Sequence, residues 1–288
     1  MRLAKYIDPG TRTIHLGSVD GALLRPMRPD ITRLSDILFA KCPAEMLAKS
    51  VDFSADPIAL DLLILLAPID DQEVWGAGVT YERSKVARVE ESESGGSFYD
   101  LVYSADRPEL FFKATPNRVV GPGKAIRVRQ DTKWCVPEPE LTLVIAPDLR
   151  LVGYTIGNDV SARDIEGQNP LYLPQAKVYD ACCGLGPWIT LAEAMPPALE
   201  IGIQLSIVRG GVEVVKGSTS IARMARNFED LISWLGRDNL FPTGAFLLTG
   251  TGVVPPDEFS LCDGDLVHIT IDGIGTLSNP VVQGPVIR

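Results

Sequence analysis

Histidine is scarce in this sequence, and cysteine is not arranged for metal or disulfide chemistry. The 288 residues include two histidines. His15 lies in a predicted N-terminal strand and His268 alternates along another, so we interpret both as structural. No Cys-x-x-Cys pair and no histidine at zinc-ligand spacing occurs. An odd number of cysteines predicts reduced, mostly buried thiols; they are Cys42, Cys135, Cys182, Cys183 and Cys262.

A long hydrophobic run is also missing. The longest apolar stretch, at 62–69, has eight residues, whereas a helix needs about 18 to 20 apolar residues to cross a bilayer. The first residues become acidic and turn-forming at Asp8, before the core of a signal peptide can develop. We therefore expect no membrane span and no secretion, which makes the cytoplasm the expected location.

Positive charge is in deficit. Lys and Arg number 27 against 37 Asp and Glu, which gives a net charge of −10 and a pI near 4.8, and no basic block occurs along the chain. This excludes nucleic acid and anionic membranes as expected partners. What is present, 45% hydrophobic and 22% charged residues, is typical of a chain that buries a sizeable core.

The chain length predicts roughly two domains at about 150 residues each. Short strands at 1–7 and 13–17 are followed by a helical pattern, with Asp30 as the expected N-cap of the helix. Turn residues mark a boundary near 66–71. We therefore predict a small N-terminal α+β domain at 1–70 and a catalytic domain at 71–288.

After residue 110 the sequence consists of short β-type runs separated by Pro and Gly. Many short strands favour a mostly antiparallel sandwich or roll, so the predicted class is mainly β with α. One helix interrupts them, capped by Asn227 and ended by Gly236. The acidic, Gly-containing stretch at 82–107 indicates either a surface excursion or a mobile lid. The predicted strands lie at 110–113, 125–128, 141–146, 151–157, 201–209, 245–249 and 266–272.

The stretch Val-Pro-Glu-Pro-Glu at 136–140 places two carboxylates on one face of an extended chain, because positions i and i+2 point to the same side. A turn near 147–148 predicts a returning antiparallel strand. In that register Glu138 lies opposite residue 157 and Glu140 opposite residue 155. Asp159, just past the returning strand, is thereby brought to both glutamates.

Three converging carboxylates without histidine or thiol favour a hard cation with oxygen ligands. Mg²⁺ fits this donor set, and Mn²⁺ or Ca²⁺ could substitute for it. The alternative is that Glu138 and Glu140 are solvated residues at a sheet edge that the prolines protect.

The segment containing Asn-Asp-x-Ser-Ala-Arg-Asp at 158–164 resembles the signature of the fumarylacetoacetate hydrolase superfamily. The order and spacing of the accompanying segments are similar to that superfamily from about residue 74 to residue 282. The resemblance is carried by 108–113, 153–168, 175–177, 186–188, 249–252, 263–265 and 273–275.

The resemblance implies a mixed β-sandwich roll behind a small N-terminal domain, and a homodimer or higher homo-oligomer. It also implies that Glu138, Glu140 and Asp159 bind the divalent metal and that Lys177 is the active-site lysine. The positions that the resemblance places near the substrate are Arg163, Gln168 and Thr251.

One departure from the superfamily pattern redirects the expected chemistry. Carbon–carbon hydrolases of the superfamily carry a water-activating histidine three residues after a tyrosine. Here Ser84 follows Tyr81 at that spacing, so the expected general base is missing. The segments 78–84, 109–118 and 166–180 resemble the branch of 2-keto-3-deoxy-pentonate dehydratases, which form 2,5-dioxopentanoate.

That chemistry suits a 2-keto acid chelated to Mg²⁺, because the cation polarises the keto group and makes the C3 protons more acidic. An enolate intermediate then expels the C4 hydroxyl as water. Lys177 and Glu109 are the candidates for base and acid, and their roles could be exchanged. Hydroxyl groups that could contact the substrate belong to Thr80, Tyr81 and Ser84.

Two other functions stay open. A metal-dependent hydrolase or decarboxylase of acylpyruvates or oxaloacetate shares the same chelation. A catalytically inactive protein that binds sugar acids or metal belongs to a different class. No Gly-x-Ser-x-Gly elbow, phosphate-binding loop or dinucleotide-binding Gly-x-Gly-x-x-Gly is found.

Overall fold

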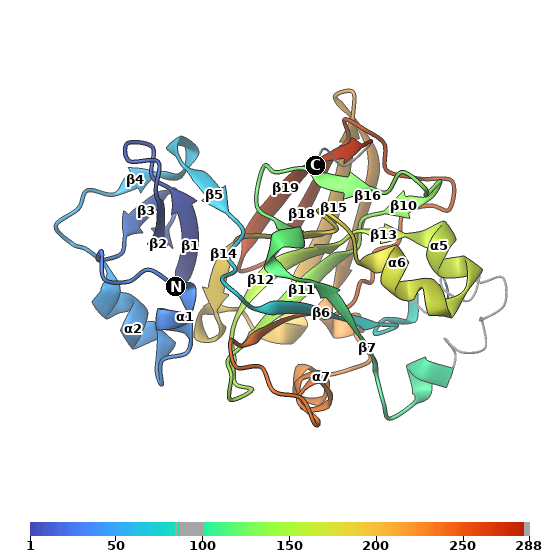
Figure 1. Ribbon diagram of the computed structural model, residues 1–288, viewed down its shortest axis with the longest axis horizontal. Coiled ribbons are helices and arrows are strands. Elements are labelled where there is room, and N and C mark those ends of the chain that lie inside the picture. The colour runs from blue at the N-terminus through green and yellow to red at the C-terminus, as the bar shows by residue number, and fades with distance from the viewer. Residues whose placement is uncertain (84–85, 87–100, 285–288) are drawn as a thin grey trace.

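The computed structural model describes residues 1–83, 86 and 101–284 (Figure 1). The predicted excursion or lid at 82–107 lies largely outside these residues. In the part of the chain that the structure describes, no helix is long and apolar enough to span a membrane.

Twelve strands form one large sheet that runs the width of the molecule (Figure 1). Its order is β4-β3-β2-β1-β14-β12-β11-β17-β6-β7, with β5 beside β1 and β8 beside β14. The bounds are β1 (Arg2–Ile7), β2 (Ile14–Asp20), β3 (Leu23–Pro26), β4 (Ile58–Ala59), β5 (Ile64–Leu66), β6 (Glu73–Gly78), β7 (Glu109–Ala114), β8 (Val119–Val120), β11 (Pro139–Ile145), β12 (Leu151–Asp159), β14 (Cys183–Leu191) and β17 (Ala245–Leu248).

A second sheet of five strands packs against the middle of the first (Figure 1). Its strands are β9 (Ile126–Val128), β15 (Gly202–Arg209), β16 (Val212–Ser220), β18 (Leu266–Ile271) and β19 (Gly275–Gln283). Side chains alternate along β18, with Val267, Ile269 and Ile271 buried. They meet Leu141 and Leu143 of β11 in one apolar core, so the predicted β-rich sandwich with α elements is confirmed.

Short helices fill the ends and flanks of the sheets. They are α1 (Leu34–Leu38), α2 (Pro43–Ser50), α5 (Arg163–Gln168), α6 (Leu173–Lys177) and α7 (Phe228–Leu235), with 3-10 turns at Leu60–Leu62, Pro116–Arg118, Pro170–Tyr172, Ala192–Ala194, Ala198–Glu200 and Ile221–Arg223. β10 (Cys135–Val136) and β13 (Ser161–Ala162) form a two-stranded ribbon. For α7 the prediction is confirmed, since the Asn227 side chain accepts a hydrogen bond from the Asp230 amide at 2.7 Å.

The predicted start of the first helix is wrong. Asp30 does not cap it, because its carboxylate pairs with the guanidinium of Arg28 at 3.2 Å. The helix begins at Leu34, and the carboxylate of Asp36 accepts a hydrogen bond from the amide of Arg33 at 3.0 Å. The N-cap position is therefore Arg33, three residues after the predicted Asp30. The free amide of Arg33 is satisfied by Asp36, an acidic residue inside the first turn.

The N-terminal strands continue the large sheet, since β1 pairs antiparallel with β14. In Figure 1 the segment coloured blue, with α1 and α2, lies at one side of the molecule. The division at 66–71 remains a prediction.

The strand β14, which joins the two parts of the sheet, was not among the predicted strands. Its sequence contains Gly184, Gly186 and Pro187, residues that ordinarily mark turns. The structure gives one reason for a glycine here: a Cβ at Gly184 would lie 2.9 Å from Oδ1 of Asn279. Gly184 is therefore compatible with a strand, because the two sheets approach closely at this position and leave no room for a side chain.

The five thiols divide into two classes, and the division gives a testable result. Cys42 and Cys262 are exposed, whereas Cys135, Cys182 and Cys183 are buried. Burial raises the pKa of the Cys135 thiol to about 12, so it stays protonated and unreactive at neutral pH. A thiol reagent should therefore modify two cysteines in the native protein and five after denaturation. Rapid modification of a third thiol in the native state would contradict this burial pattern.

Candidate active site

Three carboxylates lie close together at the end of the β11–β12 hairpin that is farthest from its turn. Glu138 directly precedes β11, Glu140 lies within it, and Asp159 ends β12. One oxygen from each lies within 4.8 Å of the others. The amide of Asp159 donates to the main-chain oxygen of Glu138 at 3.0 Å. The convergence predicted from the hairpin is therefore confirmed.

The predicted register is wrong by two residues. Glu140 pairs with Gly157, and Glu138 lies beside Asp159 instead of opposite residue 157. Two local features account for the shift. The turn centres on Asp148, with Leu149 at a φ of 65°, and the pairing jumps from Gly153 to Leu151, which leaves Val152 as an extra residue. An even shift keeps each side chain on its face, so the three carboxylates still meet.

The three carboxylates are buried, with exposures of 3% for Glu138, 2% for Glu140 and 0% for Asp159. β11 lies between β12 and β17, well inside the large sheet. The interpretation of the glutamates as solvated residues at a sheet edge is therefore wrong. Buried carboxylates at such short separation need opposite charge nearby.

Lys177 supplies part of that charge. It ends α6, and its Nζ lies 2.8 Å from Oε2 of Glu138 and 3.0 Å from Oδ2 of Asp159. It also donates to Oγ of Ser161 at 2.6 Å. Arg163 contributes a second cation, with Nη2 at 3.0 Å from Oε1 of Glu138. Both cations are buried, so Coulombic attraction is weakly screened.

Glu140 is the carboxylate with the weakest compensation. It accepts a hydrogen bond of 2.6 Å from the amide of Gly250. Burial, reinforced by the charges of Asp159 and Glu138, nevertheless raises the pKa of Glu140 well above its ordinary value. An all-oxygen, carboxylate-rich donor set in this state fits a small divalent cation, which would offset the repulsion.

The three carboxylates line a cavity. The same cavity is lined by Glu109 and Phe111 of β7, Glu166 of α5, and Thr251 of the loop after β17. Nζ of Lys177 lies 5.4 Å from the centre of the Phe111 ring. The structure therefore brings Lys177 and Thr251 together with the carboxylate cluster, as the resemblance implies, and adds Glu109, the candidate that the dehydration chemistry requires.

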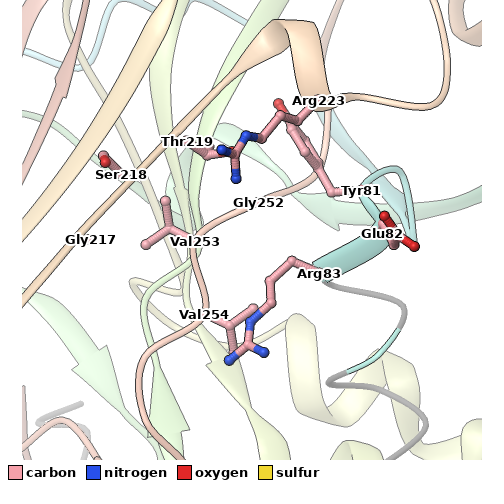
Figure 2. Close-up of a pocket in the computed structure, with 10 residues that line it drawn as sticks. All are labelled: Tyr81, Glu82, Arg83, Gly217, Ser218, Thr219, Arg223, Gly252, Val253 and Val254. Carbon is pink, nitrogen blue, oxygen red and sulfur yellow. The ribbon is translucent and has the colours of Figure 1, made fainter.

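Other predicted site residues lie elsewhere. Thr80 is buried and donates to the main-chain oxygen of Thr249 at 2.6 Å. Tyr81 lines a second, larger pocket together with Arg83 and Arg223 (Figure 2). Gln168 is exposed at the end of α5, and Ser84 lies outside the described residues.

The two pockets share chain segments. Gly78 and Val79 line the carboxylate cavity, and the next residues lead to Tyr81 in the second pocket. Likewise Gly250 and Thr251 face the first pocket, whereas 252–254 face the second. Tyr81 is almost fully buried, and this burial, with a contribution from Glu140, raises its pKa.

Two buried residues of the site had no role in the sequence analysis. Glu166 lines the cavity where Gln168 was predicted, because it follows Arg163 by three residues and shares its helix face. Lys113 lies behind Asp159, with Nζ 2.5 Å from Oδ1. Burial lowers the pKa of Lys113, but the charge of Asp159 opposes this and the net shift is upward. The alternation of Glu109, Phe111 and Lys113 along β7 is the signal that could have identified this lysine.

Replacing Gly250 by alanine tests how the loop holds Glu140. Gly250 has a φ of 89°, and a Cβ there would lie 2.0 Å from Oγ1 of Thr80 and 2.9 Å from the main-chain oxygen of Ala77. We expect a lower free energy of unfolding by about 2–4 kcal/mol and Mg²⁺ affinity weaker by about tenfold or more. Calorimetry of unfolding and of Mg²⁺ titration measures both.

Gly264→Ala is the matched control. Gly264 has a similar φ of 85°, but a Cβ there would meet no atom within 4 Å. This variant should show the backbone strain of about 1–2 kcal/mol without a change in Mg²⁺ affinity. Equal Mg²⁺ affinity in both variants would contradict the role assigned to the Gly250 amide.

These features together define a class of metal-dependent enzymes: the fold is β-rich with two sheets, a hairpin carries three buried carboxylates, and a lysine contacts the cluster. Residues 74–282 match the family model for the fumarylacetoacetate (FAA) hydrolase C-terminal domain. The chain therefore belongs to the FAA hydrolase family.

Within the family, this chain is similar to several dehydratases. The chain is 47% identical over 255 residues to a probable 2-keto-3-deoxyxylonate dehydratase of Haloferax volcanii, covering 88% of this chain and 86% of the relative. It is 48% identical over 217 residues to a 2-dehydro-3-deoxy-D-arabinonate dehydratase of Saccharolobus solfataricus, covering 74% and 73%. A solved 2-keto-3-deoxy-D-arabinonate dehydratase complexed with magnesium and 2,5-dioxopentanoate matches with a TM-score of 0.84 and 36% identity, covering 99% and 100%.

Proposed function

We propose that this chain is a Mg²⁺-dependent dehydratase of 2-keto-3-deoxypentonates, which forms 2,5-dioxopentanoate and water. The observation that carries the proposal is the buried cluster of Glu138, Glu140 and Asp159, with Lys177 paired to Glu138 and Asp159. The similarity to two dehydratases over most of the chain supports the same reaction, and so does the fold shared with a dehydratase complexed with magnesium and 2,5-dioxopentanoate.

The three carboxylates would hold the cation. When bound, Mg²⁺ accepts the carboxylate and keto oxygens of a 2-keto acid, which lowers the pKa of the C3 protons. Arg163 keeps one oxygen of Glu138 engaged, and the amide of Gly250 fixes Glu140. These contacts limit rotation of the ligands, as partners of ligating carboxylates do in other metal sites.

Lys177 and Glu109 are proposed to transfer the protons. Lys177 would take a C3 proton as the neutral amine, the form that the charge of a bound divalent cation favours. Glu109, which lines the same cavity, would donate a proton to the C4 hydroxyl, which leaves as water. The C3–H and C4–O bonds break and a C3–C4 double bond forms. Rearrangement to the aldehyde follows without change of composition. Thr251, which lines the same cavity, is the proposed contact for a substrate hydroxyl.

The test is turnover of purified protein on 2-keto-3-deoxy-D-arabinonate and 2-keto-3-deoxy-D-xylonate, with acylpyruvates and oxaloacetate as competing substrates. We expect release of 2,5-dioxopentanoate, a loss of about a hundredfold or more with EDTA, and recovery with Mg²⁺. Faster turnover of acylpyruvates or oxaloacetate would establish the hydrolase or decarboxylase instead. Mg²⁺ binding without turnover of any 2-keto acid would indicate an inactive binding protein.

Assembly and location belong to the same proposal. We propose a homodimer or higher homo-oligomer, because the family resemblance implies one, and a cytoplasmic site of action. Light scattering coupled to size-exclusion chromatography measures the first. A mass equal to the 31.2 kDa chain would contradict it.

A further inference from the structure

Lys113 is a fully buried lysine that lies behind the carboxylate cluster. On β7, Glu109, Phe111 and Lys113 point to the same face because they alternate along an extended strand. The first two line the cavity, whereas Lys113 does not. Its exposure is 0%, so it cannot touch substrate directly.

The ammonium group of Lys113 is bound on three sides. Nζ lies 2.5 Å from Oδ1 of Asp159. It donates to the main-chain oxygens of Lys177 at 2.6 Å and of Val160 at 3.0 Å. A lysine has three protons to donate and no acceptor. Two hydrogen bonds and one ion pair therefore hold the group in one position.

These contacts link the proposed metal ligand Asp159 to the proposed base Lys177. Asp159 gives one oxygen to Lys113 and presents the other, Oδ2, to Nζ of Lys177 at 3.0 Å. The main chain of Lys177 is held by the same ammonium. Lys113 therefore sets both the rotation of a metal ligand and the place of the proposed base at the end of α6.

Stability alone does not account for such an ion pair. A buried pair pays a desolvation penalty, and apolar residues of similar volume often stabilise a protein as well or better. What apolar residues cannot supply is two directed hydrogen bonds and an ion pair to fixed acceptors. The contacts of Lys113 are thus suited to specifying geometry.

We propose that Lys113 is a positioning residue, which acts through Asp159 and Lys177 to hold the proposed base at its working distance from the metal ligands. The inference rests on the proposed function for the roles of Asp159 and Lys177. It adds a residue from β7 that touches neither metal nor substrate.

The first test is Lys113→Met in the full chain with Mg²⁺ or Mn²⁺. We expect kcat to fall about a hundredfold, because displacement of a reacting group by about 1 Å has this effect. KM and Mn²⁺ affinity should change by less than about threefold, since the carboxylates and the chelated keto acid remain. The electron paramagnetic resonance spectrum of bound Mn²⁺ should change, because Asp159 is free to rotate.

Lys124→Met, which removes an exposed lysine, is the matched control and should leave all four quantities unchanged. A purely structural role predicts a different pattern for Lys113→Met. If kcat of the folded variant stays within about threefold of the wild type and only its unfolding temperature falls, the inference is overturned.

Lys113→Met leaves the buried charge of Asp159 without the charge of Lys113, and this variant could therefore fail to fold. A second pair of variants tests the inference in that case. Lys113→Met with Asp159→Asn removes both charges at nearly constant volume, and Asp159→Asn alone is its reference. Crystal structures should show Nζ of Lys177 displaced relative to Glu138 in the double variant but not in the reference. An unmoved Lys177 would overturn the inference even if the protein proved to have another substrate.

Discussion

Replacing Glu140 by glutamine is expected to abolish metal-dependent turnover while leaving the fold intact. Glutamine keeps the shape and an oxygen that can accept from the Gly250 amide, but it removes one of the three charges that would hold Mg²⁺. We expect kcat/KM to fall by about a thousandfold or more, which corresponds to about 4 kcal/mol of lost stabilisation. Turnover at increasing Mg²⁺ and calorimetric titration of Mg²⁺ measure the loss.

Thermal stability provides a separate readout for the same variant. The pKa of Glu140 is raised because burial and the charges of Asp159 and Glu138 disfavour its ionised form. Removal of that charge should therefore leave the metal-free protein at least as stable as the wild type. A ligand at about a hundred times its Kd stabilises a protein by about 2.7 kcal/mol. The wild type should show this increment with Mg²⁺, and Glu140→Gln should lack it.

Glu193→Gln is the control for loss of a carboxylate, since Glu193 is exposed on another part of the chain. It should keep both turnover and the Mg²⁺-dependent increment. Unchanged Mg²⁺ affinity in Glu140→Gln would contradict the assignment of Glu140 as a ligand.

The carboxylate cluster was predictable because two local rules suffice to find it. Alternation places Glu138 and Glu140 on one face, and a hairpin returns Asp159 to them. An error of two residues in register did not matter, because side-chain orientation has a period of two. The turn itself was predicted, but the positive φ of Leu149 and the extra residue Val152, which set the register, are not encoded in the alternating pattern.

The helical part of the site was harder to predict. Gln168 follows Arg163 by five residues, which is about 140° around a helix, whereas Glu166 follows by three and returns to the same side. The resemblance alone did not indicate which of these two residues faces the cavity. Lys113 was missed for a different reason, because a lysine near the end of a strand is ordinarily exposed. Its alternation with Glu109 and Phe111 indicates the face on which it lies, but the acceptors that stabilise its burial come from β12 and α6.

Replacing Lys177 by methionine should have the largest effect on turnover without loss of metal. Methionine keeps the length of the side chain but has no ammonium group near Glu138 and Asp159. Mg²⁺ affinity should be equal or higher, because a competing cation is gone. The kcat should fall by about 10³ to 10⁴, as expected for loss of a general base. Lys133→Met, which removes an exposed lysine, is the control.

Exchange of C3 protons with deuterium separates the roles of Lys177 and Glu109. With Mg²⁺ and 2-oxobutyrate, which has C3 protons but no hydroxyl to expel, the wild type should exchange those protons, as followed by NMR. Lys177→Met should not exchange them. Glu109→Gln should still exchange them but fail to dehydrate a 2-keto-3-deoxypentonate, because proton removal at C3 does not require the acid. The opposite pattern would make Glu109 the base, and full activity of Lys177→Met would remove lysine from the reaction.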